Sequence, residues 1–443
     1  MTEVSGDFGH PEKYKGEIKM KKTILTLLLG ALMLSGCGGN SAPASQAEDN
    51  EDSVITEQST ETMEENIGET GNLDDLIEKT YGGFVSTETC YDTFVLKNNS
   101  NQNVRVNVDI TGFDSQNAEL ATESCSFPFL GADETLAYSH CFSGIKEVDH
   151  VEYNFSYEVN TDYAPVMKDI KCDWLRIDEN HLLVVARNEG ELPGTEIIAT
   201  AFFYDENNNF IYAMNSYIGD LDGEIKPGAA VTYQFASYEH FDHAEVYLYG
   251  GCDLSNPPQE WGISEKNLQV TEYRYQNETY FTDEALVIEN NFDKHAKVRV
   301  DMVAYDSKGN VIGGGSDCTT NYGCLAPGHE AVLYARLMCV NVDHIDLFYS
   351  YNTYEDASTV LENIEYTYEI DGQDVIITAT NNGTESLKNM YCQILYFDLT
   401  GKFSNIGRVY FNSEGGDLLP GETRSCVAAD YPYAFSDVLV YIE

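Results

Sequence analysis

Residues 286–309 read LVIENNFDKHAKVRVDMVAYDSKG, and this stretch carries the pattern that decides the fold. An apolar run ends at Asn290 and a second asparagine. In the next run, residues 298–304, apolar side chains alternate with polar ones. Alternation with a period of two is typical of a half-buried β-strand. Asp306 and the glycine that follows end this run in a turn. The stretch therefore predicts two strands separated and followed by tight turns.

The same pattern occurs four times between residues 84 and 443. Each copy has an apolar strand before an asparagine, then a strand that ends in an aromatic residue and an aspartate. An apolar turn, usually with Pro-Gly, and an alternating closing strand follow. The first copy departs most, because its third turn lacks the Pro-Gly pair. The marker residues are Asn98, Asn188, Asn290 and Asn381, then Asp114, Asp205, Asp306 and Asp398.

The spacing of these copies matches a whole small domain. The asparagines at 98, 188, 290 and 381 are 90, 102 and 91 residues apart, which is too long for a solenoid repeat. Short strands, Asn, Asp, Gly and Pro turns and almost no helical periodicity predict an all-β chain of four tandem immunoglobulin-like β-sandwich domains. We expect these domains at 77–162, 163–260, 261–355 and 356–443.

Two details of this prediction concern residues outside the strands. Residues 73–81 are expected to form a short helical lead-in to the first domain. Gly313-Gly-Gly315 is expected at the tip of a hairpin.

The order of strands and turns resembles the FxLYD-type and related immunoglobulin-like repeats of bacterial lipoproteins. The likeness is best at Ile394-Leu-Tyr-Phe-Asp398 and Ala201-Phe-Phe-Tyr-Asp205, and it covers most of residues 84–443. The motif is short and degenerate. It implies the fold and a position outside the cytoplasm, and it implies no activity.

Residues 21–37, KKTILTLLLGALMLSGC, form a second informative stretch. Two lysines, an apolar run too short to span a membrane and small residues are the parts of an export signal. The ending Leu34-Ser-Gly-Cys37 resembles the lipobox of bacterial lipoproteins. The resemblance implies that residues 1–36 are removed and that Cys37 becomes a diacylated N-terminus. A plain signal peptide with a chance cysteine is the alternative.

Residues 37–76 would then connect the lipid to the domains. The segment is rich in Ser, Glu, Gln, Asn and Thr, and it holds almost no aromatic residues. It cannot bury enough apolar surface to offset the entropy of ordering. We therefore expect a flexible acidic linker on a protein that is lipid-anchored in the cell membrane and faces outside the cytoplasm.

The composition is strongly acidic, with 25 Lys and Arg against 74 Asp and Glu and a net charge of −49. Such a surface repels nucleic acid and anionic lipid headgroups. Cations or a basic partner remain compatible with it. Solubility of an exported protein is the simpler explanation of the charge.

Ten cysteines besides Cys37 fit structural disulfides in an exported protein. They do not occupy matched positions in the four copies, and connectivity cannot be derived from sequence. Zinc is disfavoured because Cys-x-x-Cys is absent. Plausible pairs are Cys125 with Cys141, Cys172 with Cys252, Cys392 with Cys426, and Cys339 with Cys318 or Cys324; Cys90 and one cysteine of the third copy would be left over.

Catalytic and metal-binding patterns are weak. Asp-His occurs before three closing strands, at 149–150, 242–243 and 343–344, but each pair would stand in a separate domain. A turn role is favoured over acid–base chemistry. His240 beside Asp242-His243 could hold a metal, and the turn after Asp205 resembles half a calcium loop, yet both fit ordinary turns better. We predict no catalytic residues, metal or cofactor.

These observations favour a membrane-anchored bacterial surface lipoprotein that is not an enzyme and serves in binding, adhesion or spacing. Its partners would be the membrane, through the lipid, and an unknown extracellular protein or glycan, and a basic partner would match the acidic charge. A solute-binding lipoprotein of a transporter would need two α/β lobes. An exported hydrolase would need a triad or paired carboxylates within one domain.

Overall fold

The computed structural model describes residues 77–85, 90–142, 145, 148–255, 267–319, 324–354, 360–388, 390–411, 416–429 and 434–442. All of them belong to one compact unit, Ile67–Glu443. The predicted signal, lipidated Cys37 and acidic linker lie outside the described residues. None of the helices in these ranges is long and apolar enough to cross a membrane.

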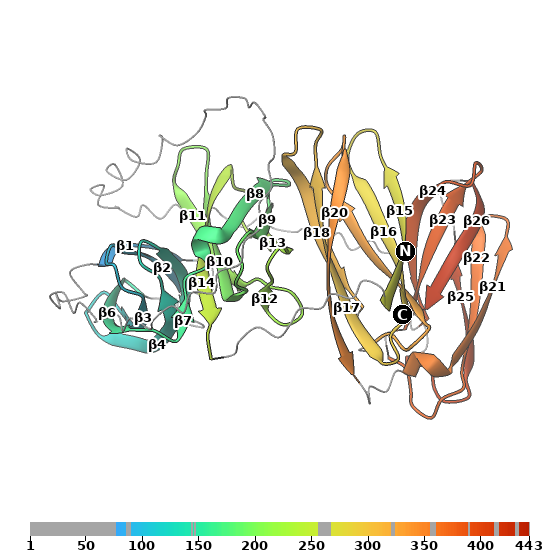
Figure 1. Ribbon diagram of the computed structural model, residues 1–443, viewed down its shortest axis with the longest axis horizontal. Helices are drawn as coiled ribbons and strands as arrows, with labels where there is room; N and C mark the ends of the chain where they lie inside the picture. The colour runs from blue at the N-terminus through green and yellow to red at the C-terminus, as the bar shows by residue number, and fades with distance from the viewer. Residues whose placement is uncertain are drawn as a thin grey trace, which may run out of the picture. The chain divides into compact units, whose positions relative to one another are not determined.

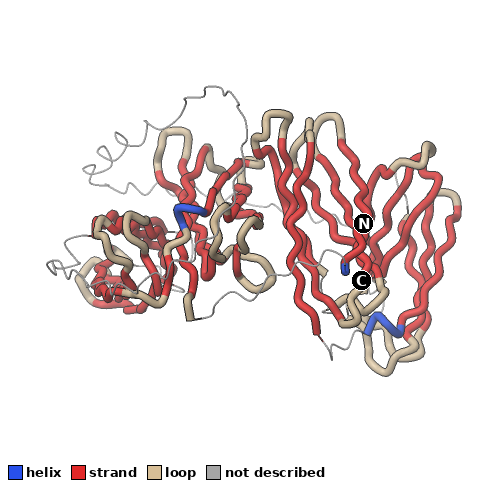
Figure 2. Tube along the Cα trace, in the orientation of Figure 1, coloured by secondary structure: helices blue, strands red, loops and turns tan. Residues whose placement is uncertain are grey.

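The described chain is built from β-strands, with two short 3₁₀ helices (Figure 2). Strands of the first sandwich are β1 (Ile77–Val85), β2 (Cys90–Asn98), β3 (Val104–Phe113), β4 (Glu119–Leu130), β5 (Thr135–Phe142) and β6 (His150–Val159). Those of the second are β8 (Ile170–Arg176), β9 (His181–Asn188), β10 (Gly194–Tyr204), β11 (Phe210–Tyr217), β13 (Ala230–Ala236) and β14 (His243–Asp253), with the short β7 (Tyr163–Ala164) and β12 (Glu224–Ile225).

The third and fourth sandwiches repeat this order. Strands of the third are β15 (Leu268–Gln276), β16 (Thr282–Asn290), β17 (His295–Tyr305), β18 (Val311–Cys318), β19 (Glu330–Leu337) and β20 (His344–Tyr354). Those of the fourth are β21 (Ile364–Asp371), β22 (Asp374–Asn381), β23 (Tyr391–Asp398), β24 (Phe403–Tyr410), β25 (Thr423–Ala428) and β26 (Phe435–Ile442). The 3₁₀ helices η2 (Met167–Asp169) and η4 (Val360–Asn363) precede β8 and β21.

One topology recurs four times. The first, second and fifth strands of each sandwich form one antiparallel sheet, as in β1-β2-β5, and the fourth, third and sixth form another, as in β4-β3-β6. We name these the first and second sheet of each sandwich. The chain crosses between them after the second, fourth and fifth strands, which is the immunoglobulin-like arrangement that the sequence predicts. Figure 1 shows it most openly in the fourth sandwich, with β21, β22 and β25 against β23, β24 and β26.

The repeated asparagine is buried, and its side chain joins the end of the second strand to the third turn by hydrogen bonds. In the second sandwich Asn188 Nδ2 donates to the carbonyls of Leu192 and Ile225 at 2.7 and 2.8 Å, and its Oδ1 accepts from Gly190 N–H. Because a buried amide must be hydrogen-bonded, this position requires Asn. The equivalent bonds occur in the other three copies, at Asn98, Asn290 and Asn381.

The third turn needs a left-handed residue in every copy. Gly228, Gly328 and Gly421 have φ between 74° and 76° there, and each donates its N–H to the carbonyl of the repeated asparagine. The first copy has no Pro-Gly, and Asp133 takes this place with φ 62°. An aspartate tolerates this conformation better than most residues. The departure in sequence therefore leaves the turn unchanged.

Two local predictions were wrong. Residues 77–81, expected at the end of a helical lead-in over 73–81, belong to strand β1 because they pair along β2. Gly313–Gly315 is not a hairpin tip and lies within β18. A Cβ on Gly314 would stand 3.3 Å from Leu183 and Thr232 of the second sandwich, so glycine here permits close contact between two sandwiches.

Neighbouring sandwiches share apolar clusters outside their own cores. The outer face of each first sheet packs on the outer face of the next second sheet. Ala137 contacts Phe202 and Ala213 at the first junction, and Leu183 and Val185 contact Val303 at the second. The third junction joins Ala285, Val287 and Val332 to Leu395 and Phe403.

Buried hydrogen bonds accompany these apolar contacts. Thr200 Oγ1 donates to the Ala137 carbonyl at 2.8 Å across the first junction. Asp301 accepts from both Thr232 N–H and Thr232 Oγ1 across the second, and Gln393 donates to the Val332 carbonyl across the third. The sandwiches are thus joined by directional contacts as well as by apolar burial.

Candidate functional site

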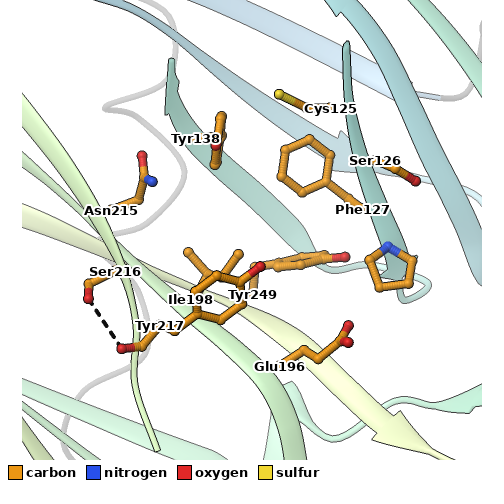
Figure 3. A pocket seen from close by; sticks show the side chains of 11 residues that line it. Cys125, Ser126, Phe127, Tyr138, Glu196, Ile198, Asn215, Ser216, Tyr217 and Tyr249 are labelled. Atoms are coloured by element: carbon orange, nitrogen blue, oxygen red, sulfur yellow. Dashed lines mark hydrogen bonds between the residues drawn. The ribbon is translucent and has the colours of Figure 1, made fainter. Parts of the chain in front are cut away.

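A cavity of about 260 Å³ opens at the junction between the first two sandwiches. Strands β4 and β5 contribute Phe127 and Tyr138 from one side, while β10, β11 and β14 contribute Ile198, Tyr217 and Tyr249 from the other. Figure 3 shows these side chains, with those of Asn215 and Ser216 beside Tyr217. The volume lies slightly below the roughly 300 Å³ at which small-molecule pockets begin. A ligand for this cavity would therefore be small.

Aromatic rings form most of its apolar wall. The Phe127 ring stands edge-on to the rings of Tyr138 and Tyr249, with centroids 5.0 and 5.7 Å away. Tyr249 is buried, and its hydroxyl accepts the N–H of Phe129 at 3.0 Å. Tyr217, by contrast, is 72% exposed and borders the opening. The wall therefore has a fixed buried part and one accessible ring.

Burial governs the ionisation of the groups in the wall. It raises the pKa of Tyr138 to about 12, and the neighbouring Cys125 and Tyr217 add to the rise. It also raises the pKa of Tyr249 and of the Cys125 thiol. These hydroxyls and this thiol are therefore protonated at neutral pH. Cys125, hydrogen-bonded to Tyr138, is a poor nucleophile in this state.

Glu196 lies at the opening in an unusual conformation. It has φ 53° although it is not glycine, and it belongs to a β-bulge in which Glu196 and Ile197 oppose only Gly250. A left-handed residue other than glycine costs about 1–2 kcal/mol, and such strain is concentrated at functional sites. A Cβ on Gly250 would lie 2.4 Å from Ile197, so this bulge also requires its glycine.

The three Asp-His pairs have a structural role. Each imidazole lies within 3.4 Å of its neighbouring carboxylate: His150 with Asp149, His243 with Asp242, and His344 with Asp343. Each also stacks on the aromatic residue at the end of the third strand of its sandwich, with centroids 4.9–5.2 Å apart. The pairs stand in three different sandwiches, so they do not form one site. In the fourth copy Ser436 and Asp437 take the places of the aspartate and the histidine, and Ser436 donates to the Asp398 carbonyl.

The turn after Asp205 is closed by its own hydrogen bonds. Asp205 Oδ1 accepts the N–H groups of Asn207 and Asn209, and Oδ2 accepts Asn209 Nδ2. These bonds lower the pKa of Asp205, the Asn209 side chain first. Asp114, Asp306 and Asp398 accept the equivalent pair of N–H groups. Among the described residues, His240 included, no three or more His, Cys, Asp or Glu side chains are grouped so that they could hold a metal ion.

All nine cysteines whose side chains are described are thiols. The predicted bridge between Cys125 and Cys141 is not formed, and the strand geometry explains why. Cys125 packs toward the core of the first sandwich. Cys141 precedes the core residue Phe142 on β5, so it projects from the opposite face of that strand. The two side chains point to different faces and cannot meet without backbone movement.

The other predicted pairs divide in two groups. Cys392 and Cys426 enter one core from facing sheets, and a hydrogen bond from the Cys392 thiol lowers the pKa of Cys426. Cys172 and Cys252 both pack against the core of the second sandwich. Cys339 packs in the core of the third sandwich, whereas Cys318 lies opposite Arg299, away from that core, and Cys324 is near Lys297. The structure therefore does not join Cys339 to either alternative. Cys37 and the side chain of Cys90 lie outside the described residues.

The cavity was not predicted from the sequence. Its residues come from five strands of two sandwiches, and each strand fits an ordinary repeat. One signal was present: Thr195-Glu-Ile-Ile198 interrupts the alternation of β10, as a bulge does.

Comparison with known proteins adds little to this geometry. No family model and no curated protein sequence matches the chain. Among solved structures, the crystal structure of red sea bream transglutaminase matches 46% of this chain and 36% of its own, at 11% identity and a TM-score of 0.14. At this TM-score the match carries no argument about fold or activity.

Proposed function

We propose that this chain is a membrane-anchored surface lipoprotein that binds a ligand without catalysing a reaction. The lipobox at Cys37 supports the anchor, and the fold and the predicted position outside the cytoplasm fit display at a cell surface. The observation that carries the binding role is the cavity between the first two sandwiches. Its wall combines apolar rings with a few polar groups, as small-ligand sites do.

The two alternatives find less support. A transporter's solute-binding protein would need two α/β lobes, whereas the described residues form four β-sandwiches. A hydrolase would need reactive groups within reach of each other in one sandwich. The Asp-His pairs stack separately on aromatic rings instead.

Array binding of the intact chain tests the proposal. Asn215→Trp would place a large ring in the cavity, because Asn215 lies on the face of β11 that borders it. Ser156→Trp would place the same ring on an exposed strand position away from it. We expect glycan or peptide signals that disappear with Asn215→Trp and persist with Ser156→Trp. Signals unchanged by Asn215→Trp would contradict binding at this cavity.

A further inference from the structure

We propose that the cavity between the first two sandwiches binds an organic ammonium group on a short apolar stem. This inference rests on the proposed function and specifies the chemistry of its ligand. The ammonium could belong to a free amine or to a lysine side chain of a basic peptide.

The wall is suited to a cation. Phe127, Tyr138, Tyr217 and Tyr249 surround the space, and aromatic faces attract ammonium groups through the ring quadrupole. The protonated hydroxyls of Tyr138 and Tyr249 keep this wall neutral, so the rings keep their apolar character. No Lys, Arg or His is among the described residues that line the cavity.

Glu196 supplies the complementary charge. It lines the cavity, and its negative charge contributes to the raised pKa of Tyr249, after burial, so it lies close to the aromatic wall. The bulge and its positive φ hold the backbone of Glu196 at this place at an energetic cost. A carboxylate beside aromatic rings favours a cation over a neutral molecule of equal shape.

Three further features bear on the size of the ligand, its rate of association and its polar contacts. A space of about 260 Å³ admits a trimethylammonium or butylammonium group but not a folded peptide. The net charge of −49 attracts cations over long range and repels anions. Asn215, whose Oδ1 accepts Ser139 N–H at 3.0 Å, borders the same space and can hydrogen-bond a polar end of the ligand.

Calorimetric titration of the intact chain tests this inference with three compounds. Choline is the quaternary ammonium, Nα-acetyl-lysine amide represents a lysine side chain, and 3,3-dimethylbutan-1-ol is the uncharged isostere of choline. We expect at least one cation to bind about tenfold more tightly than the isostere. Which cation binds distinguishes a free amine from a peptide side chain.

Matched variants separate charge from shape. Glu196→Gln should weaken cation binding about tenfold and leave the isostere unchanged, while Glu206→Gln on an exposed turn should change neither. Tyr217→Leu should weaken cation binding roughly two- to fivefold, as expected for one exposed cation–π contact. Tyr280→Leu, at a tyrosine that is 70% exposed in the third sandwich, is its control.

The outcomes are distinct. Equal affinity for choline and its isostere, or a Glu196→Gln variant that binds cations normally, would overturn the ammonium assignment while the array signals could still support binding at the cavity. No binding of either cation at millimolar concentration would also overturn it. Array signals insensitive to Asn215→Trp would overturn the proposed function instead.

Discussion

Three residues before the repeated asparagine, the outer face of the first sheet carries Val95, Val185 and Val287 in the first three sandwiches, and Thr378 in the fourth. The valines lie at junctions, and Val185 and Val287 are buried there. Thr378 shares a hydrogen bond of 2.7 Å with Ser425 on an outer face that no described sandwich covers. One position in one fold is apolar or polar according to whether a neighbour covers it.

The second sheets show the same contrast at the other end. Two residues before the aromatic-Asp pair, Phe202, Val303 and Leu395 are buried at junctions, whereas the first sandwich has Thr111, which shares a hydrogen bond with Thr122. Stacked repeats need terminal units with polar outer faces to stay soluble. The two outer faces that no described sandwich covers, here called the terminal faces, are polar in this way, whereas the faces at the junctions are apolar.

The largest effect should follow loss of a charge at a junction. Asp301→Ala would leave Thr232 N–H and Arg299, which hydrogen-bond Asp301 at 2.8 Å, without their acceptor. We expect about 3 kcal/mol of destabilisation, measured by hydrogen exchange in β13 and β17. Asp109, four residues before the aromatic residue as Asp301 is, accepts only Ser124 Oγ on the terminal face. Asp109→Ala should cost less than about 1 kcal/mol, and equal losses would refute the contrast.

Exchanging valine and threonine at the position three residues before the repeated asparagine should have a smaller effect. Val185→Thr buries a hydroxyl at the second junction and should cost about 1–2 kcal/mol in denaturant unfolding. Thr378→Val removes a surface hydrogen bond and should stay within about 0.5 kcal/mol. A loss of stability larger than this from Thr378→Val would show that the terminal face is covered after all.

The effect of pH on stability should differ between two glutamates that occupy the same turn in the first and the fourth sandwich. Glu134 and Glu422 each accept an N–H three residues upstream at 2.9 Å. Burial raises the pKa of Glu134 to about 7 from 4.5, whereas the N–H of Leu419 and Arg424 lower the pKa of Glu422. The stabilisation from Glu134 is therefore full below pH 4.5 and lost as the pH rises through 7. That from Glu422 is present above pH 4.5 and lost as the pH falls.

Melting temperatures across pH 4–8 check these signs. Relative to Glu134→Gln, the wild type should lose stability as the pH rises. Relative to Glu422→Gln, it should lose stability only as the pH falls below 4.5 and should stay level above it. Parallel curves for wild type and Glu134→Gln would contradict the burial of this carboxyl.

Thiol oxidation should distinguish cysteine pairs that face the same core from pairs that face different sides of a sheet. It should disturb the fold least of all these changes. Mild oxidation followed by non-reducing peptide mapping should recover Cys392 joined to Cys426, because these thiols already share a hydrogen bond. A pair of Cys125 with Cys141 should be absent. Its recovery in high yield would show that β5 has the opposite face toward the core.

Much of the fold was predictable because turn chemistry is local. The repeated asparagines and aspartates act through bonds to residues within a few positions, so their spacing revealed four copies. Junctions depend on which outer faces meet, and that information is spread over distant copies. Thr111 and Thr378 can be recognised as residues of uncovered outer faces only once the packing of the sandwiches is known. The error over Cys125 and Cys141 arose because sequence proximity was considered and strand parity was not.

Hydroxyl-radical footprinting of the intact chain tests the stacked arrangement most directly, since it reports the solvent exposure of side chains. In the stacked arrangement Phe202, Tyr305 and Phe403, each at most 7% exposed, should resist modification. Tyr217, Tyr238 and Tyr280, each at least 70% exposed, should react fast. If the three junction residues reacted as fast as the exposed tyrosines, the sandwiches would not pack on one another, and the contrast between internal and terminal faces would be wrong.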